Sequence, residues 1–437
     1  MTITHASFHT PLEINNRRMI SNIRTLLRTS ALIVCLTAFC SCSDNANSDK
    51  SIIDVAAVIG KGSVHNASEF IKEIRYIPLE TTSNSLVGNI QEVLVENEKI
   101  YMLDLNSTIN IFDLNGKYLN TLNQKGRGDK EYSSITDFAI TPEGNIMILS
   151  GTKEILEYDE NLNFVKKGVP EEATPTIFQS LTLLQNGLFA SSTMEYDRSG
   201  FNDAISIYDW SFNTLFLYAD SFRPPTSMTI IEQGGYYTFL GGRMRPYLHY
   251  VYDNDLSIYR SGNDTIFRIN ILDNYSKHVR YIMDYGIYTN PAIANSDQRI
   301  PDDTNIILLS SMDEIENHIF FVFNFNSLAP EAFTMDIASS DGTTYNRKNT
   351  NVCAIYDKKR GNLLLLNQPS PQSFGLKDDI TNGVAFWPKR ITKRQELITW
   401  HNAFDLISLA EEGKIDKSLV ANLKEDDNPV IVIATPK

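Results

Sequence analysis

From about residue 70 onward, short runs of alternating apolar and polar residues are separated by turn residues. Between residues 99 and 122 there are three such runs, divided by Asn106-Ser107 and by Leu114-Asn115-Gly116. An Asn-Gly pair between alternating runs is a strong hairpin signal, and a period of two is typical of strands with one buried face. Residues 99–122 are therefore predicted to form three antiparallel strands joined by tight turns.

The next segment repeats this plan. Residues 135–141 are followed by a Pro-Glu-Gly-Asn turn and by three further strand-like runs, at 146–150, 154–159 and 164–168. An aromatic residue followed by aspartate closes the third strand of the unit, and the chain contains five such pairs: Phe112-Asp113, Tyr158-Asp159, Tyr208-Asp209, Tyr252-Asp253 and Tyr356-Asp357. We interpret them as structural, with the aspartate starting a turn and the ring packing between repeats.

The spacing of these pairs indicates the fold class. The aspartates are 46, 50, 44 and 104 residues apart, and the last interval is close to two units. A period of about 45–50 residues with about four strands per unit is typical of a β-propeller blade and not of a helical solenoid. The predicted fold class is all-β, with blades that stack around a central channel.

A resemblance to a known family gives the number of blades. The segment 126–132, read as Gly-x-Gly-x-x-Glu-Tyr, with the strand, Pro-x-Gly-Asn turn and aromatic-Asp pair that follow, resembles the NHL-type repeat. More closely, it resembles the six-bladed β-propeller lipoproteins of Bacteroidota, as do residues 76–82, 264–267 and 426–433. The family usually has Pro-Gly where this loop has Asp129-Lys130. The resemblance implies a six-bladed propeller over residues 70–437.

The two ends of this region are expected to meet. A strand at 70–79 is predicted to complete the last blade beside residues 429–434, which removes free sheet edges. Apolar residues recur at helical spacing over 402–423, interrupted at Gly413, and predict a short helical insertion in the last blade. Because six blades need more residues than the repeat supplies, insertions are also expected at 241–261, 290–303 and 334–351.

The first 41 residues resemble a bacterial lipoprotein signal peptide. Four arginines, at positions 17, 18, 24 and 28, precede the apolar run 31–39, and Ser41 precedes Cys42 as in a lipobox. We predict a signal peptide at 1–41, lipidation at Cys42 and a tether and N-terminal segment at 42–69. The protein would then be an exported outer-membrane lipoprotein, held to the membrane by its lipid anchor and facing the periplasm or the cell surface. The alternative is an ordinary secretory signal with incidental cysteines.

Composition excludes several classes of protein. The chain of 437 residues has a formal net charge of −14, which argues against nucleic acid as a partner because phosphate contacts need a basic face. Its 42% hydrophobic content suffices for a buried core, and its 4 cysteines are too few for a disulfide framework. No unbroken apolar run reaches the roughly 18 residues of a membrane-spanning helix, which excludes a polytopic membrane protein.

One stretch stands out as a candidate ligand surface. Residues 234–260 combine six tyrosines with three arginines in an otherwise acidic protein, a pairing suited to stacking on sugars or gripping an anion. The alternative is that the tyrosines line blade faces and the arginines neutralise neighbouring carboxylates. Trp387 and Trp400 are interpreted first as core aromatics and second as a recognition platform. The candidate ligand-binding residues are Tyr236, Tyr237, Arg243, Arg245, Tyr247 and Tyr250.

The sequence contains no recognisable catalytic motif, and we predict no catalytic residues, no metal ligands and no cofactor. The histidines lack metal-ligand spacing, and residues 253–255 begin like a calcium loop that then lacks its glycine and glutamate. Calcium held by carbonyls of the inner strands is the alternative. The predicted function is non-catalytic binding or scaffolding of a glycan, peptide or envelope protein. The runner-up is a hydrolase or lyase, which should show His, Asp or Glu converging at the channel mouth with displaced pKa values.

Overall fold

The computed structural model describes residues 51–437, apart from 152, 169–175, 198–199, 220–228, 234–235, 241–246, 261–262, 289–304 and 339–343. The chain divides into two compact units, Met1–Ser48 and Asp49–Lys437, and every described residue belongs to the second unit. Cys42 therefore lies outside the described residues, as do residues 290–303 of one predicted insertion.

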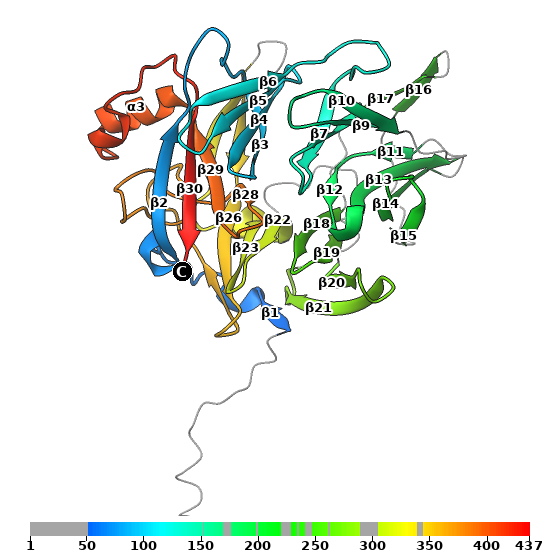
Figure 1. Cartoon of the computed structure of the whole chain (residues 1–437). Helices are drawn as coiled ribbons and strands as arrows, with labels where there is room; N and C mark the ends of the chain where they lie inside the picture. Colours follow the sequence, from blue (N-terminus) through cyan, green and yellow to red (C-terminus); the bar gives the residue numbers. More distant parts are fainter. Residues whose placement is uncertain are drawn as a thin grey trace, which may run out of the picture. The chain divides into compact units, whose positions relative to one another are not determined.

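Six antiparallel sheets form the six blades of a propeller, as predicted (Figure 1). In each blade the strand named first is the innermost. Blade I contains β3 (Ile90–Glu96), β4 (Lys99–Asp104), β5 (Ile109–Asp113) and β6 (Tyr118–Leu122), and blade II contains β7 (Ile135–Ile140), β8 (Ile146–Ser150), β9 (Glu154–Tyr158) and β10 (Phe164–Gly168). Blade III contains β12 (Thr182–Leu183), β13 (Phe189–Asp197), β14 (Gly200–Tyr208) and β15 (Thr214–Ala219), with β11 (Thr176–Phe178) also paired to β13.

The remaining blades follow the same order. Blade IV contains β18 (Tyr247–Tyr252), β19 (Asp255–Arg260), β20 (Thr265–Asn270) and β21 (Ser276–Asp284), and blade V contains β22 (Leu308–Glu314), β23 (His318–Asn324), β26 (Asn351–Asp357) and β27 (Asn362–Leu365). Blade VI contains β28 (Arg390–Ile391), β29 (Leu397–His401), β30 (Val430–Pro436) and β2 (Ile71–Pro78).

The ring is closed by strands from opposite ends of this region. The early strand β2 pairs antiparallel with the final strand β30, with Tyr76 opposite Val432, and Figure 1 shows the two side by side. The predicted closure is confirmed. It gives the last blade its outermost strand from the beginning of the propeller and leaves β30 without a free edge.

Buried apolar residues form a cluster between each pair of neighbouring blades. One cluster joins Tyr101 of blade I to Phe138 of blade II, and another joins Ile398 of blade VI to Val93 of blade I. Four further clusters fill the other contacts between blades in the same way. Because a four-stranded sheet has two apolar faces, each blade is stable only between two neighbours, and the ring supplies both.

The aspartates of the repeated pairs start turns, as predicted. Oδ1 of Asp113 accepts hydrogen bonds from the backbone N–H groups of Asn115 and Lys117, at 2.8 and 2.9 Å. Asp159, Asp209 and Asp357 make the same kind of contact in blades II, III and V.

The prediction that Tyr252-Asp253 closes a third strand is wrong. Tyr252 ends β18, the first strand of blade IV, and Asp253 and Asn254 both have positive φ, which suits the two-residue hairpin turn into β19. In this blade Asn270 ends the third strand, and its Oδ1 accepts the backbone N–H groups of Leu272 and Asp273 instead.

Two hairpins and one helix extend beyond the blades. The hairpin of β24 (Phe333–Ala338) and β25 (Thr344–Asn349) confirms the insertion predicted at 334–351, whereas that of β16 (Thr229–Gln233) and β17 (Tyr236–Leu240) was not predicted. The insertion predicted at 241–261 is wrong, because residues 247–260 are the first two strands of blade IV. Their aromatic and turn residues belong to the blade itself.

The helical insertion lies between β29 and β30. Helix α3 (Ala403–Glu411) buries Leu406 and Ala410, ends just before Gly413 with its φ of 73°, and is followed by the 3-10 helix η5 (Lys417–Val420). The other 3-10 helices are η1 (Ala56–Val58), η2 (Ala67–Glu69), η3 (Gln185–Gly187) and η4 (Asn326–Leu328). None of the described helices is long and apolar enough to cross a membrane.

The segment before β2 also packs on the propeller. Strand β1 (Ile52–Asp54) pairs in parallel with β21 of blade IV, and Ser63 forms a bridge to Leu366, just after blade V. Val55 and Ile53 are buried in the cluster between blades IV and V. Residues 51–69 therefore connect blades IV, V and VI along their outer side.

Candidate binding site in the central channel

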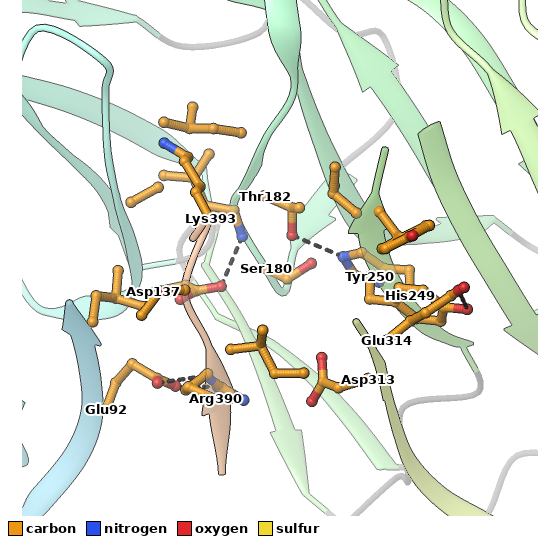
Figure 2. A pocket seen from close by; sticks show the side chains of 18 of the residues that line it. Glu92, Asp137, Ser180, Thr182, His249, Tyr250, Asp313, Glu314, Arg390 and Lys393 are labelled. Atoms are coloured by element: carbon orange, nitrogen blue, oxygen red, sulfur yellow. Dashed lines mark hydrogen bonds and ion pairs between the residues drawn. The ribbon is translucent and has the colours of Figure 1, made fainter. Parts of the chain in front are cut away.

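The innermost strands of all six blades line a channel cavity of about 500 Å³ (Figure 2). Alternation along each strand decides which side chains reach it. On β3, Glu92, Leu94 and Glu96 face the cavity, whereas Val93 and Val95 are buried in the cluster between blades VI and I. The cavity wall combines charged and hydroxyl groups with apolar side chains, and it is surrounded by apolar clusters.

Two ion pairs hold blade VI to blade I across this wall. The Arg390 guanidinium binds the Glu92 carboxylate through both Nε, at 2.5 Å from Oε1, and Nη2. Lys393 Nζ lies 3.8 Å from Glu96 Oε2 and 3.4 Å from the carbonyl oxygen of Ile140 in blade II. Burial by itself lowers the pKa of Arg390, but the attraction of the Glu92 carboxylate has the larger effect, so the pKa of Arg390 is raised. This arginine remains a fixed cation of the channel.

Asp137 links blades II and III. Its Oδ2 accepts the backbone N–H of Leu181 at 2.8 Å, and its Oδ1 accepts that of Phe138 at 2.9 Å. Burial raises the pKa of Asp137 to about 6 despite these hydrogen bonds, with Glu92 adding to the rise and Arg390 opposing it. The carboxyl group is therefore partly protonated close to neutral pH.

Asp313 of β22 is the less engaged of the two acids. Burial raises its pKa to about 6, and the attraction of Arg390 only partly offsets that rise. Among the described residues, none forms a hydrogen bond or ion pair with the Asp313 carboxyl group. Asp137 and Asp313 both lie within the electrostatic influence of Arg390, and Figure 2 shows all three around the cavity. A carboxyl group with this pKa can donate as well as accept a hydrogen bond.

A buried charge network lies on the opposite side, between blades IV and V. The fully buried Glu314 carboxylate accepts Tyr250 Oη at 2.7 Å through Oε2, and Arg280 Nη2 and Lys358 Nζ, each at 2.7 Å, through Oε1. Nearby, Thr182 Oγ1 lies 3.0 Å from His249 Nε2. Glu314 is thus fully engaged by protein groups and ties blade IV to blade V.

The structure brings only part of the predicted ligand surface to this cavity. Tyr247 and Tyr250 line it, and both are buried, at 2% and 6% exposure. Tyr236 and Tyr237 belong to β17, whose side chains are outside the described part of the structure, and Arg243 and Arg245 lie outside the described residues. The described tyrosines act as wall groups of the channel and are not exposed on an outer face.

Sequence reasoning missed Glu92, Asp137, Asp313 and Arg390. One signal could have found Asp137, because it stands inside the mostly apolar first strand of its unit, residues 135–140. A polar residue at such a position faces the channel in a propeller. In the described part of the chain, no group of three or more His, Cys, Asp or Glu residues is arranged to hold a metal ion.

The six sheets and their ring closure define a six-bladed β-propeller. Residues 50–435 match the family described as Domain of unknown function (DUF4934), and the chain belongs to that family. No curated protein matches it.

Two solved structures are similar in fold. A crystal structure from Bacteroides fragilis NCTC 9343, described as a "putative exported protein", is 17% identical, has a TM-score of 0.60 and covers 88% of this chain and 99% of its own. A member of the DUF4221 family from Bacteroides vulgatus ATCC 8482 is 11% identical, has a TM-score of 0.44 and covers 84% of this chain and 97% of its own. The first of these supports the six-bladed fold.

Proposed function

We propose that this protein is an exported lipoprotein that binds a glycan in its central channel without transforming it. The main support for this proposal is the channel wall. Carboxyl groups, hydroxyl groups and one guanidinium, contributed by the blades, line a single cavity of about 500 Å³. That volume lies within the roughly 300–1,000 Å³ of ordinary small-ligand sites. The Asp313 carboxyl group has hydrogen-bonding capacity that the described residues do not use.

Sugar hydroxyl groups match this wall chemically. Each hydroxyl both donates and accepts, and carboxyl groups with a pKa of about 6, such as Asp137 and Asp313, can do the same near neutral pH. Arg390 adds donors of fixed charge. A peptide or envelope protein would have to insert an extended polar segment into the same cavity.

The proposed anchor sets where the binding happens. Lipidation at Cys42, followed by the polar residues 43–50, would hold the propeller close to the outer membrane. The exported description of a protein with the same fold is consistent with this placement. Mass spectrometry of the protein from membranes tests it, because diacylglyceryl and acyl groups on Cys42 are expected and an unmodified Cys42 would contradict the anchor.

Calorimetric titration with a panel of neutral and acidic oligosaccharides tests the channel site. We expect binding by the native protein, about tenfold weaker binding by Asp313→Asn, and no change in Asp426→Asn, an exposed control aspartate. A panel without any binder would contradict glycan binding, and a binder that Asp313→Asn holds at full affinity would contradict a channel site.

One observation favours the alternative of a hydrolase or lyase. Two acids with a raised pKa, Asp137 and Asp313, share one cavity, and general acid–base catalysis uses such groups. Chromatography of each bound oligosaccharide after long incubation separates the two functions. Unchanged ligand is expected, whereas cleavage that disappears in both Asp137→Asn and Asp313→Asn would establish an enzyme.

A further inference from the structure

A second and larger cavity lies away from the channel, between blades V and VI. Its volume is about 720 Å³. Strands β26 and β29 contribute Cys353, Thr399 and His401, the linker before blade VI contributes Phe374 and Trp387, and the helical insertion contributes Leu409. Alternation along β29 points Thr399 and His401 to this side, while Ile398 and Trp400 face the cluster shared with blade I.

Packed aromatic and aliphatic side chains form the apolar part of the wall. Trp387 packs edge-on against Phe320 of β23, with ring centroids 5.5 Å apart. Phe374 packs against Phe333 of the β24–β25 hairpin at 5.5 Å. Leu409 and Ile415 close the cavity from the insertion around α3. These rings and aliphatic groups offer a surface for a flat or branched apolar body.

The charged groups that line this cavity are mostly cationic. They are Lys377, Lys389, Lys414 and Asp378. The single carboxylate, Asp378, is engaged by its own loop, because it accepts the backbone N–H groups of Ile380 and Thr381 and the hydroxyl of Thr381. Its charge is thus used in shaping the residues 378–383 and is not directed at a ligand.

Among the described residues, Lys377 and Lys389 form no ion pair, whereas Lys414 Nζ lies 2.6 Å from Glu412 Oε2. Lys389 Nζ donates to the carbonyl oxygen of Trp400 at 3.1 Å and lies 4.3 Å from the centroid of the Trp400 ring. In the described part of the chain, no carboxylate lies within ion-pair distance of this ammonium. The Lys389 side chain is solvent-exposed, and partial burial lowers its pKa while leaving the ammonium open to a bound anion.

His401 adds hydrogen bonding without charge. Burial, together with the neighbouring Lys389, lowers the pKa of His401 to about 4, so the ring is neutral at physiological pH. No described residue forms a hydrogen bond with its ring nitrogens. A neutral imidazole, a hydroxyl from Thr399 and the Lys389 ammonium therefore stand on one wall, with aromatic rings on another.

We propose that this cavity is a second ligand site, and that it takes a small organic anion with an apolar or aromatic body. Lys389, assisted by Lys414, would bind the acidic group, and Trp387 and Phe374 would pack on the body. The site is independent of glycan binding in the channel, since the two cavities share no lining residue.

Two fluorescent probes that differ mainly in one acidic group test this proposal: 1-anilinonaphthalene-8-sulfonate and its neutral analogue N-phenyl-1-naphthylamine. We expect the sulfonate to bind the native protein about tenfold more tightly than the neutral probe. Lys389→Met should remove that preference, Lys389→Arg should retain it, and Trp387→Leu should weaken both probes. Lys424→Met, on an exposed lysine outside the cavity, is the matched control.

Several outcomes would overturn the second site. They are equal affinity for the two probes, absence of binding by either, or an unchanged preference in Lys389→Met. If Lys389→Met fails to fold, Lys414→Met serves in its place, because that side chain is 60% exposed, and an unchanged sulfonate affinity would again count against the site. Asp313→Asn must leave probe binding intact, which separates this test from that of the channel.

Discussion

Two acids, Asp137 and Asp313, are the residues on which the channel chemistry depends. Their carboxyl groups face a polar cavity, yet burial raises the pKa of each to about 6. Asp137 is partly compensated by two backbone N–H groups, whereas the described residues offer no hydrogen-bond donor to Asp313. Buried acids with a raised pKa cluster at functional sites, which agrees with the ligand site proposed for this cavity.

The raised pKa of Asp313 predicts a distinctive pH dependence of stability. Between its ordinary pKa of 3.8 and the folded value of about 6, the folded state binds the proton more tightly, so stability falls as the pH rises through this window and then levels off. Asp313→Asn has no carboxyl group at this position, so it should not lose stability over this pH window. It should exceed the native protein in stability at pH 7.5 by an amount on the order of 1 kcal/mol, and the difference should shrink towards pH 4.

Thermal unfolding of both proteins between pH 4 and pH 8 measures this effect. Asp426→Asn should follow the native curve throughout. If the curves of Asp313→Asn and the native protein stay parallel over the whole range, the pKa of Asp313 is not raised in the folded state.

At the scale of elements, charged side chains join neighbouring blades at the channel. Glu92 and Glu96 of β3 bind Arg390 and Lys393 of blade VI, and Glu314 of β22 binds Arg280 of β21. The Glu314 network is the most buried, with side-chain exposures of 0% for Glu314, 10% for Arg280 and 18% for Lys358. Removing one partner from such a network leaves an uncompensated buried charge.

Glu314→Gln should therefore destabilise the protein strongly, by about 3–5 kcal/mol. The control is Glu412→Gln, whose pair with Lys414 is more than half exposed and should contribute about 0–1 kcal/mol. Urea unfolding measures both changes, and the double variant Glu314→Gln with Arg280→Met should recover part of the loss. Equal effects of Glu314→Gln and Glu412→Gln would mean that the blade IV–V network has no special role.

At the scale of the whole molecule, the strands and their closure were predictable, and the channel was not. Hairpins such as β4–β5 are encoded locally, by a few turn residues between alternating runs. Asp137, Asp313 and Arg390 lie far apart in the sequence and meet only because the ring closes. The second cavity likewise depends on how the insertion at α3 packs against blade VI. Blade IV shows why the motif alone does not identify every third strand, since Asn270 takes the place of the aspartate that follows or ends the third strands of blades I, II, III and V.

Ring closure can be tested by cross-linking β2 to β30. Glu73 lies opposite Thr435 in the register of these strands, and each stands near the surface. The double variant Glu73→Cys with Thr435→Cys should form an intramolecular disulfide on mild oxidation, detected by mass spectrometry. Glu73→Cys with Ala434→Cys, which is one residue out of register and points to the other face, should not. A disulfide in the second pair alone would mean a different register.

The central claim is that the ligand of this propeller binds in the channel formed by the innermost strands. Hydrogen–deuterium exchange of the protein with and without the glycan that binds most tightly tests it most directly. The account predicts slower exchange in peptides that cover 308–314 and 390–395, and unchanged exchange in the outer strand at 118–122 and in the insertion at 403–411. Protection confined to residues 403–415, or to the outer strands, with none in the channel peptides, would contradict it.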